Sequence, residues 1–328
     1  MNIFITGVSG FIGSFLAKRL LNEGNTVYAL CRGRPDFSHP NLNIINSDIN
    51  DPSSYTKGLK DCELLFHCAA HIGFQKKDYE IAHRVNVDGT RSVLDACLNS
   101  SVKKIVHLSA CAVLGVSAES NRLIDESSKP DISKDNVYAY TKRLSEEIAL
   151  EYAQKGLDIS IANIATVYGA GDKKMNSGTI IKLIYEGKIK IAPSGGTSYV
   201  SVNNLVDGLI LLSQKGKSAE RYIFCTENLI YKDLFQRIAN VLGVKKTFYR
   251  IPNCFKQPAI FFANIAELIL PKSKDGVNLI SGQIIKETFG YKYFNSQKAK
   301  KELGWNPKET LEDAVKEAFQ YYKSQGLL

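Results

Sequence analysis

The chain has 328 residues, of which 44% are hydrophobic and 23% charged, as is typical of a soluble globular protein with one large or two modest domains. Its seven cysteines include no C-x-x-C pair, which argues against a disulfide framework or a metal site and favours a reducing, cytoplasmic location. The formal net charge is +9, but the basic residues form no run of five, so we expect no nucleic-acid partner.

The first half of the chain alternates apolar, β-branched runs with amphipathic helical patterns. Such alternation is typical of a parallel sheet that helices cover on both faces. We therefore predict an α/β fold with a doubly wound parallel sheet, the Rossmann fold. The predicted strands are residues 3–6, 26–30, 43–45, 64–67, 104–109 and 159–163, and the predicted helices are 11–21, 81–98 and 137–154.

The second half is less regular. Residues 180–191 and 198–214 each combine a helical and a strand pattern, while 231–243 and 311–326 are amphipathic helices. Because no flexible linker separates the halves, we predict a smaller, mostly helical C-terminal substrate domain that packs on the first. The predicted dinucleotide-binding domain is 1–168, with 200–225 returning to it, and the substrate domain is 169–199 and 226–328.

The longest apolar block is residues 259–270, with 12 residues. It contains Asn264 and Glu267 and is too short to span a bilayer, so we expect no membrane span. A block of this length is typical of a buried or interfacial helix. Core packing and the wall of a pocket for a lipophilic substrate are both compatible with it.

Three glycines, Gly7, Gly10 and Gly13, stand three residues apart in GVSGFIG, between the first strand and the first helix. This is the context of a dinucleotide fingerprint, although the usual spacing is G-x-G-x-x-G. Glycines let the chain turn tightly and let a pyrophosphate lie on bare backbone at a helix N-terminus. An ordinary glycine-rich turn is the alternative interpretation.

The end of the second strand reads VYALCRGRP. A protein that binds NAD usually offers an acid here to the adenosine ribose, but this chain has Cys31, followed by Arg32 and Arg34. A guanidinium suits a 2′-phosphate, so NADP is favoured over NAD. The alternative is that both arginines are solvated loop residues.

Tyr138 and Lys142 are four residues apart, which places them on one face of the helix that precedes the sixth strand. A tyrosine needs help to act as a general acid or base at neutral pH, and a nearby ammonium group lowers its pKa. The same ammonium group could bind the nicotinamide ribose. The alternative is an exposed helix whose tyrosine and lysine have no catalytic role.

Together with these motifs, SDIN, HCAA, NVDGT, YAYTK, VYGAGD, YVSVNNLVDG and KAKKELGWNPKETLEDAVKEA cover nearly the whole chain. The chain resembles the extended short-chain dehydrogenases/reductases of the NAD(P)-dependent epimerase/dehydratase family. Its segments VHLSACAVLG and NSGTIIKLIYEGK are closest to the members that are similar to dihydroflavonol reductase and hopanoid-associated reductase. The resemblance implies that the cofactor contacts Gly7, Ser9, Gly10, Phe11, Ile12, Gly13, Asp48, Ile49, Ala69 and Ala70, with Asn86 as an anchor, Tyr138 as acid/base and Lys142 as its partner.

The chain departs from this family at two positions. Relatives carry a serine or threonine that binds the reacting oxygen where this chain has Ala110, which leaves Ser109 as the catalytic candidate and Cys111 as a weaker one. Nucleotide-sugar members carry an arginine for the diphosphate where this chain has Thr197. A diphosphate would need another cation, for which Lys182 and Lys292 are candidates.

We therefore predict an NAD(P)-dependent oxidoreductase that transfers hydride to or from a carbonyl or secondary alcohol of a small molecule. A nucleotide-sugar epimerase or dehydratase with tightly bound NAD is one alternative. A cofactor-binding regulator with impaired catalysis is another. The resemblance also implies a homodimer, whose four-helix bundle would use residues 81–99 and 137–154 of each subunit.

Overall fold

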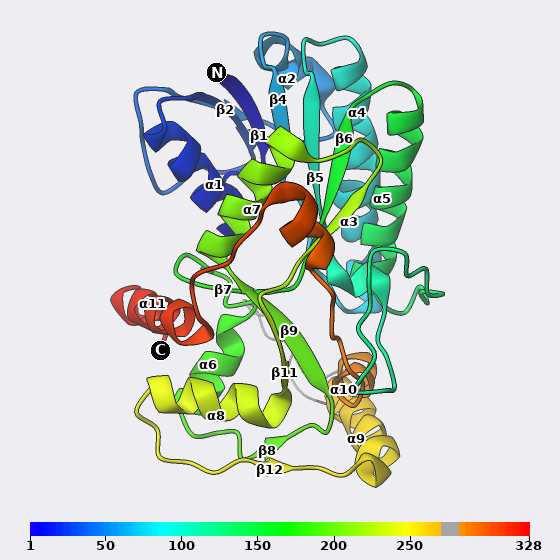
Figure 1. Ribbon diagram of the computed structural model, residues 1–328, viewed down its shortest axis with the longest axis vertical. Coiled ribbons are helices and arrows are strands. Elements are labelled where there is room, and N and C mark those ends of the chain that lie inside the picture. Colours follow the sequence, from blue (N-terminus) through cyan, green and yellow to red (C-terminus); the bar gives the residue numbers. More distant parts are fainter. Residues whose placement is uncertain (270–281) are drawn as a thin grey trace.

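Seven parallel strands form the central sheet, in the order β10-β6-β5-β4-β1-β2-β3 (Figure 1). The computed structural model describes residues 1–269 and 282–328. Strands β4 and β6 are buried along their whole length because helices cover both faces, which confirms the predicted doubly wound fold. The strands are β1 (Asn2–Thr6), β2 (Thr26–Cys31), β3 (Leu42–Asn46), β4 (Leu64–His67), β5 (Lys104–Ala110), β6 (Ile159–Ile164) and β10 (Arg221–Phe224).

Two apolar clusters hold helices on the two faces of this sheet. Leu16 and Leu209 belong to one cluster, and Tyr55, Leu94 and Tyr152 belong to the other. The strand order reverses between β1 and β4, where an open α/β sheet forms a crevice at the carboxyl ends of its strands. The helices are α1 (Phe11–Asn22) and α7 (Val202–Lys215) on the first face, and α2 (Pro52–Leu59), α3 (Tyr79–His83), α4 (Gly89–Leu98) and α5 (Val137–Gln154) on the second.

A smaller region lies beyond the carboxyl ends of the large sheet, in the lower part of Figure 1. Besides the expected helices it contains a three-stranded sheet, β11-β9-β7, and a two-stranded one, β12-β8. The predicted domain boundaries stay a prediction, although β10 does lie in the large sheet beside β6. The elements are β7 (Thr166–Tyr168), β8 (Ile191–Ala192), β9 (Gly196–Ser201), β11 (Glu227–Ile230), β12 (Tyr249–Arg250), α6 (Gly178–Tyr185), α8 (Tyr231–Val241), α9 (Lys256–Ile269), α10 (Gly282–Thr288) and α11 (Leu311–Ser324).

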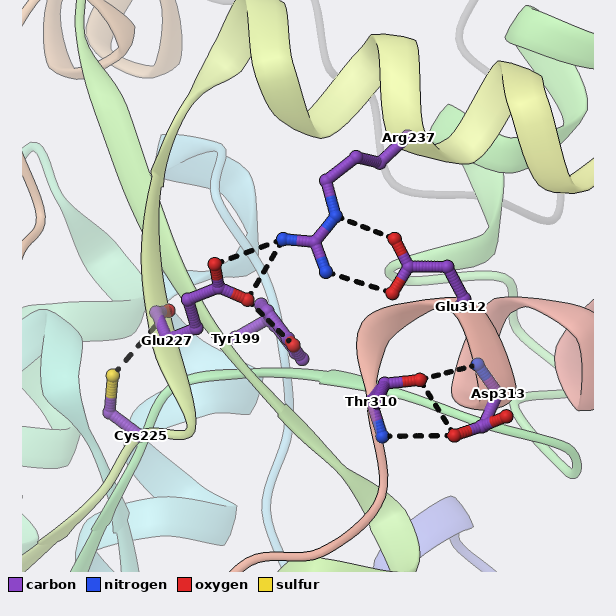
Figure 2. Close-up of polar contacts among 7 residues, drawn as sticks. All are labelled: Tyr199, Cys225, Glu227, Arg237, Thr310, Glu312 and Asp313. Atoms are coloured by element: carbon purple, nitrogen blue, oxygen red, sulfur yellow. Dashed lines mark hydrogen bonds and ion pairs between the residues drawn. The ribbon is translucent and has the colours of Figure 1, made fainter.

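An arginine holds three elements of the smaller region together (Figure 2). Arg237 on α8 donates to both carboxylate oxygens of Glu227 on β11, at 2.9 Å, and to both of Glu312 on α11, at 2.6 and 2.8 Å. Helix α11 begins with a capping box, in which Thr310 and Asp313 bind each other's backbone and side chains. These charge-assisted bonds fix the C-terminal helix against the small sheet.

Helix α9 shows that the apolar block 259–270 is not simply part of the core. The last residue of this block, 270, lies outside the described residues. The core-packing interpretation is wrong for Phe261 and Phe262, which are 62% and 67% exposed. In the part of the chain that the structure describes, no helix has the length and apolar character needed to cross a membrane.

Candidate active site

The protein's own backbone explains two of the three glycines between β1 and α1. Gly7 has φ +75°, and a Cβ there would lie 2.8 Å from the backbone of Ala69. A Cβ at Gly13 would lie 2.4 Å from the Gly7 carbonyl oxygen. Gly10 is exposed, and the atom nearest to an added Cβ is the same oxygen at 3.1 Å. The turn therefore requires Gly7 and Gly13, while Gly10 keeps the outer surface of the loop bare.

The N-terminus of α1 opens toward solvent at this loop. Ser9 and Gly10 are exposed, and within the described residues no side chain caps the helix at Gly10. The first turn of α1 contains no acidic residue. Backbone N–H groups at such an end have no partner in the helix and carry a partial positive charge. The donor set therefore fits the pyrophosphate of a dinucleotide.

The carboxyl ends of β2 and β3 carry an arginine and an aspartate. Arg32 and Arg34 are exposed, whereas Cys31 is buried. The backbone N–H of Asn50, which binds the Asp48 carboxylate at 2.9 Å, is the main cause that lowers the pKa of Asp48. The guanidinium groups of two arginines contribute, and one of them is Arg32. Arg32 and Asp48 therefore lie at the same corner of the sheet.

The other residues expected to contact the cofactor differ in their solvent exposure. Ala70 is exposed and Ala69 is half-buried, with its N–H bound to the hydroxyl of Thr6 at 3.0 Å. Ile49 is buried, and its side chain fills the space beside Gly89, where a Cβ would come within 2.8 Å. Any contact of Ile49 with a cofactor must therefore come mainly from its backbone.

A row of buried, hydrogen-bonded polar groups connects the loop to α5, and no motif in the sequence indicates it. The Thr6 hydroxyl lies 2.9 Å from His67 Nδ1, and Thr90 Oγ1 lies 2.9 Å from His67 Nε2. Thr90 also lies 3.3 Å from Ser145, whose hydroxyl is 2.8 Å from His107 Nε2. The only signal in the sequence is a single histidine within each of two apolar strands, LLFH and KIVHLSA.

The hydrogen bonds require His67 to be neutral. Thr90 donates its only proton to the Asn86 carbonyl oxygen at 2.6 Å, so Nε2 of His67 must donate to Thr90. Thr6 accepts from a backbone N–H, which leaves its proton for Nδ1 of His67. Burial, with the positive charge of Lys142 as a smaller cause, lowers the pKa of His67 to about 3. The same causes lower the pKa of His107 well below its usual value.

These two histidines predict that the protein loses stability in mild acid. Their pKa values in the folded state lie below the 6.5 of the unfolded chain, so stability is complete above that pH and falls as the pH drops toward 3. For His67 the loss is up to about 1.4 kcal/mol per pH unit, or about 2 kcal/mol between pH 7 and 5, and His107 changes stability in the same direction. Urea unfolding at several pH values measures this. A urea midpoint that stays the same between pH 7 and 5 would contradict it.

Asn86 ties the loop after β4 to α5. It is 1% exposed and lies in a π-helical turn, Arg84–Asp88. Its Oδ1 accepts from the N–H of His71 at 2.7 Å, and its Nδ2 donates to the His71 carbonyl and to the Thr141 hydroxyl, each at 3.0 Å. The segment that contains Ala69 and Ala70 is therefore held beside the helix that carries Tyr138.

Tyr138 and Lys142 lie in the first two turns of α5, one helical turn apart. The Tyr138 ring is half-buried against Phe74, with ring centroids 5.7 Å apart. Desolvation raises its pKa to about 12, so the expected lowering of this pKa by the Lys142 ammonium group is wrong. Its hydroxyl has no hydrogen-bond partner among the residues that the structure describes. Lys142 is 3% exposed and donates to the Leu108 carbonyl of β5 at 2.6 Å, and burial lowers its pKa to about 8.

The carboxyl end of β5 carries Ala110 at the position where the family resemblance implies a serine or threonine. Pairing with β6 continues regularly through Ser109 and Ala110, so their side chains point to opposite faces. Ser109 Oγ is buried without a partner in the described part of the chain. The Cys111 thiol binds the Asn163 carbonyl at 3.4 Å, and burial raises its pKa well above the usual value. Cys111 is therefore a neutral thiol and a poor proton donor.

The two lysines considered as cations for a diphosphate both have protein partners. Lys182 donates to the Leu327 carbonyl at 2.6 Å, and Lys292 forms an ion pair with Glu287 at 2.8 Å. Thr197 is buried in β9. None of the three positions offers an unpaired cation to a diphosphate.

Comparison with known proteins gives a consistent set of relatives. Residues 3–224 match the NAD dependent epimerase/dehydratase family. A putative dihydroflavonol 4-reductase of Synechocystis sp. is 30% identical, over 98% of this chain and 95% of that protein. Sterol demethylase protein B of Methylococcus capsulatus is 24% identical over the full length of both chains. The crystal structure of gox2253 superimposes with a TM-score of 0.82 at 28% identity, covering 99% of both chains.

Proposed function

Because the chain belongs to the NAD dependent epimerase/dehydratase family, we propose that it is an NAD(P)-dependent oxidoreductase. The proposed reaction moves a hydride to or from the carbon of a carbonyl group or a secondary alcohol, with Tyr138 as the acid/base. One observation carries this proposal. The open N-terminus of α1 and the pair Tyr138–Lys142 lie at the same carboxyl edge of the sheet. Buried side-chain hydrogen bonds, which run from Thr6 through His67 and Thr90 to Ser145 on α5, connect the two.

The proposed cofactor site follows this edge from β1 to α5. The N–H groups at the start of α1 would hold the pyrophosphate, and the end of β2 would hold the adenosine ribose. Residues in the loop after β4 would leave room for the rest of the dinucleotide. The residues proposed for these contacts are Gly7, Ser9, Gly10, Phe11, Ile12, Gly13, Arg32, Asp48, Ile49, Ala69, Ala70, Tyr138 and Lys142, with Asn86 holding the loop in place.

A nicotinamide cofactor, when bound, would supply the hydride chemistry, and Tyr138 would exchange the proton on the substrate oxygen. With a pKa of about 12 the Tyr138 hydroxyl is protonated at neutral pH, which suits a donor of a proton to a carbonyl oxygen. In the oxidative direction the same hydroxyl would first have to lose its proton. Lys142 Nζ is fixed at Leu108, where it has further N–H groups for a ribose hydroxyl. Ser109 stays a candidate for a second contact with the reacting oxygen.

We propose an apolar carbonyl compound or alcohol as the substrate, in preference to a nucleotide sugar. The ring of Phe74 packs on Tyr138, and Thr197, Lys182 and Lys292 provide no unpaired cation for a diphosphate. The names of the relatives, dihydroflavonol 4-reductase and sterol demethylase protein B, also point to polycyclic substrates. These names define the compounds to test first.

The direct test supplies the purified protein with NADPH and a panel of dihydroflavonols, steroid ketones and aromatic aldehydes. Consumption of NADPH that depends on one of these compounds is expected, and absorbance at the nicotinamide band measures it. A protein that is isolated with NAD tightly bound and acts on UDP- or dTDP-sugars would contradict the proposal. Such a result would support the epimerase/dehydratase alternative.

Arg32 is proposed to select NADP over NAD. Arg32→Ser should weaken NADPH binding by about ten- to a hundred-fold, because a charge-assisted contact to the 2′-phosphate contributes about 1.5–3 kcal/mol. NADH binding should change less than twofold. Fluorescence titration measures both, with Arg34→Ser as the matched control two residues further along the exposed loop. Equal or tighter binding of NADH by the unaltered protein would contradict this prediction.

We further propose a cytoplasmic homodimer. All seven cysteines are free, and six of them are buried or half-buried, which supports a reducing compartment. The helices expected to form a four-helix bundle with a second copy correspond to α3, α4 and α5, and Ile81 and Leu98 on them are each 42% exposed. Light scattering after size-exclusion chromatography tests the dimer.

A further inference from the structure

The end of the molecule farthest from the large sheet carries a group of exposed large apolar side chains. We call it the α9 surface, and it consists of Ile191 (53% exposed), Tyr249 (69%), Phe255 (54%), Phe261 (62%) and Phe262 (67%). Ile191 and Tyr249 are paired residues of β8 and β12, and Phe255 is the last residue before α9. Figure 1 shows these elements together at the lower end of the molecule.

The two phenylalanines of α9 point outward. Ala263 is buried and Ala259 and Ile260 are half-buried, whereas Phe261 and Phe262 are exposed and lie three and four residues after the exposed Pro258. Residues with this spacing share one helical face. An aromatic face left in water is unfavourable by roughly 1.5–3 kcal/mol for each large side chain. An exposed apolar patch of this kind marks a surface that meets another apolar phase.

The charge around the α9 surface indicates whether it meets a membrane or another protein surface. Residues 187–193 and 244–264 contain six basic residues and no acidic one, although the whole chain has 33 acidic residues for 42 basic ones. Lys188 is paired with Glu186, and Arg250 binds the Ser194 carbonyl and the Tyr291 hydroxyl. Lys246 donates to the Gly187 carbonyl. The attraction to an anionic surface therefore rests mainly on the remaining three, Lys190, Lys245 and Lys256.

Aromatic side chains among an excess of lysines match the boundary of an anionic bilayer, where rings enter the headgroup region and ammonium groups bind phosphates. Glu186 and Glu267 are the acidic residues that flank the ranges 187–193 and 244–264 in the sequence. A second copy of the same surface is a poorer match, because like charges would face each other. We propose that the α9 surface docks the protein on anionic membranes, with Phe261 and Phe262 inserted at the interface. The protein would then be peripheral to the bilayer. This inference does not depend on the proposed oxidoreductase activity.

Flotation with lipid vesicles tests the proposal on the full-length protein. Vesicles of phosphatidylcholine with phosphatidylglycerol should bind it, vesicles of phosphatidylcholine alone should not, and added salt should weaken the binding. The double variants Phe261→Ser/Phe262→Ser and Lys190→Glu/Lys245→Glu should each lower the partition coefficient by about tenfold or more. Lys57→Glu/Lys60→Glu changes the net charge equally at the C-terminal end of α2, at the opposite end of Figure 1, and should bind like the unaltered protein.

A fluorescent reporter gives an independent measurement. Trp305 is the only tryptophan and is 2% exposed, so the emission of Phe262→Trp should shift to the blue only when anionic vesicles bind the new indole. Absence of this shift, absence of flotation, or an equal loss of binding in the α2 control would overturn the proposal. It would also be overturned if Phe261→Ser/Phe262→Ser converted a dimer into a monomer. The α9 surface would then be an interface between copies.

Discussion

Replacing Tyr138 with phenylalanine is expected to lower the rate of carbonyl reduction by about 10²–10⁴-fold, because the phenol is the proposed proton donor. The ring would keep its contact with Phe74, and within the described residues the hydroxyl binds no other group. Thermal stability and NADPH affinity should therefore change little. Steady-state kinetics on the compound found in the carbonyl panel measure the loss, which should appear in kcat and in kcat/KM alike.

Tyr140→Phe is the matched control, since Tyr140 is also half-buried and lies two residues further along α5. Its ring contacts Tyr79, with centroids 6.5 Å apart, and it has no proposed role in catalysis. It should retain the rate within about twofold, as substitutions away from a site usually do. Equal rates for Tyr138→Phe and the unaltered protein would exclude Tyr138 as the acid.

Ala110→Ser is expected to raise kcat by about 10²–10³-fold, because it restores a hydrogen-bond donor toward the reacting oxygen. The backbone already has the regular β5–β6 pairing that aims this side chain away from the face of Ser109. The gain should be confined to kcat, since a donor to the reacting oxygen acts most strongly in the transition state. Kinetics with NADPH and the same carbonyl compound measure it.

Ser109→Ala tests whether Ser109 supplies the hydrogen bond to the reacting oxygen that Ala110 cannot supply. If the buried, unpartnered Ser109 hydroxyl turns toward the substrate, Ser109→Ala should lower the rate about as much as Ala110→Ser was expected to raise it. In that case Ala110→Ser should add little, and the expectation for Ala110 would be wrong. If neither the unaltered protein nor Ala110→Ser reduces any compound while NADPH still binds, the regulator alternative is supported.

Sequence patterns predicted six of the seven strands of the large sheet and missed β10. They also indicated a strand within 180–191 and one within 198–214, but not the two small sheets that β8 and β9 form. A run such as residues 43–45 continues as an alternating pattern, and the structure extends it by one residue at each end to Leu42–Asn46. β8 has only two residues, Ile191–Ala192, and β7 has three, so neither is long enough to show a period. Their pairing depends on partners such as β12, which lies more than fifty residues away.

The candidate site was likewise predictable from the sequence only in its local motifs. The glycine turn and Tyr138–Lys142 are local patterns, so their spacing is visible in the sequence. The bonds between Thr6 and His67 join residues 61 positions apart, and those between His67 and Thr90 join residues 23 apart. Hydrophobic periodicity also identifies an apolar face of a helix without telling whether anything covers it. The exposure of α9 could therefore be seen only in the structure.

A structure of the protein with bound NADP⁺ tests the central claim most directly. The quantity to measure is the distance from C4 of the nicotinamide to the Tyr138 hydroxyl. We predict about 5 Å, which leaves room for one carbon–oxygen bond of a substrate between a hydride contact and a hydrogen bond. A distance of more than about 10 Å, or a phenol turned out to solvent, would contradict the account.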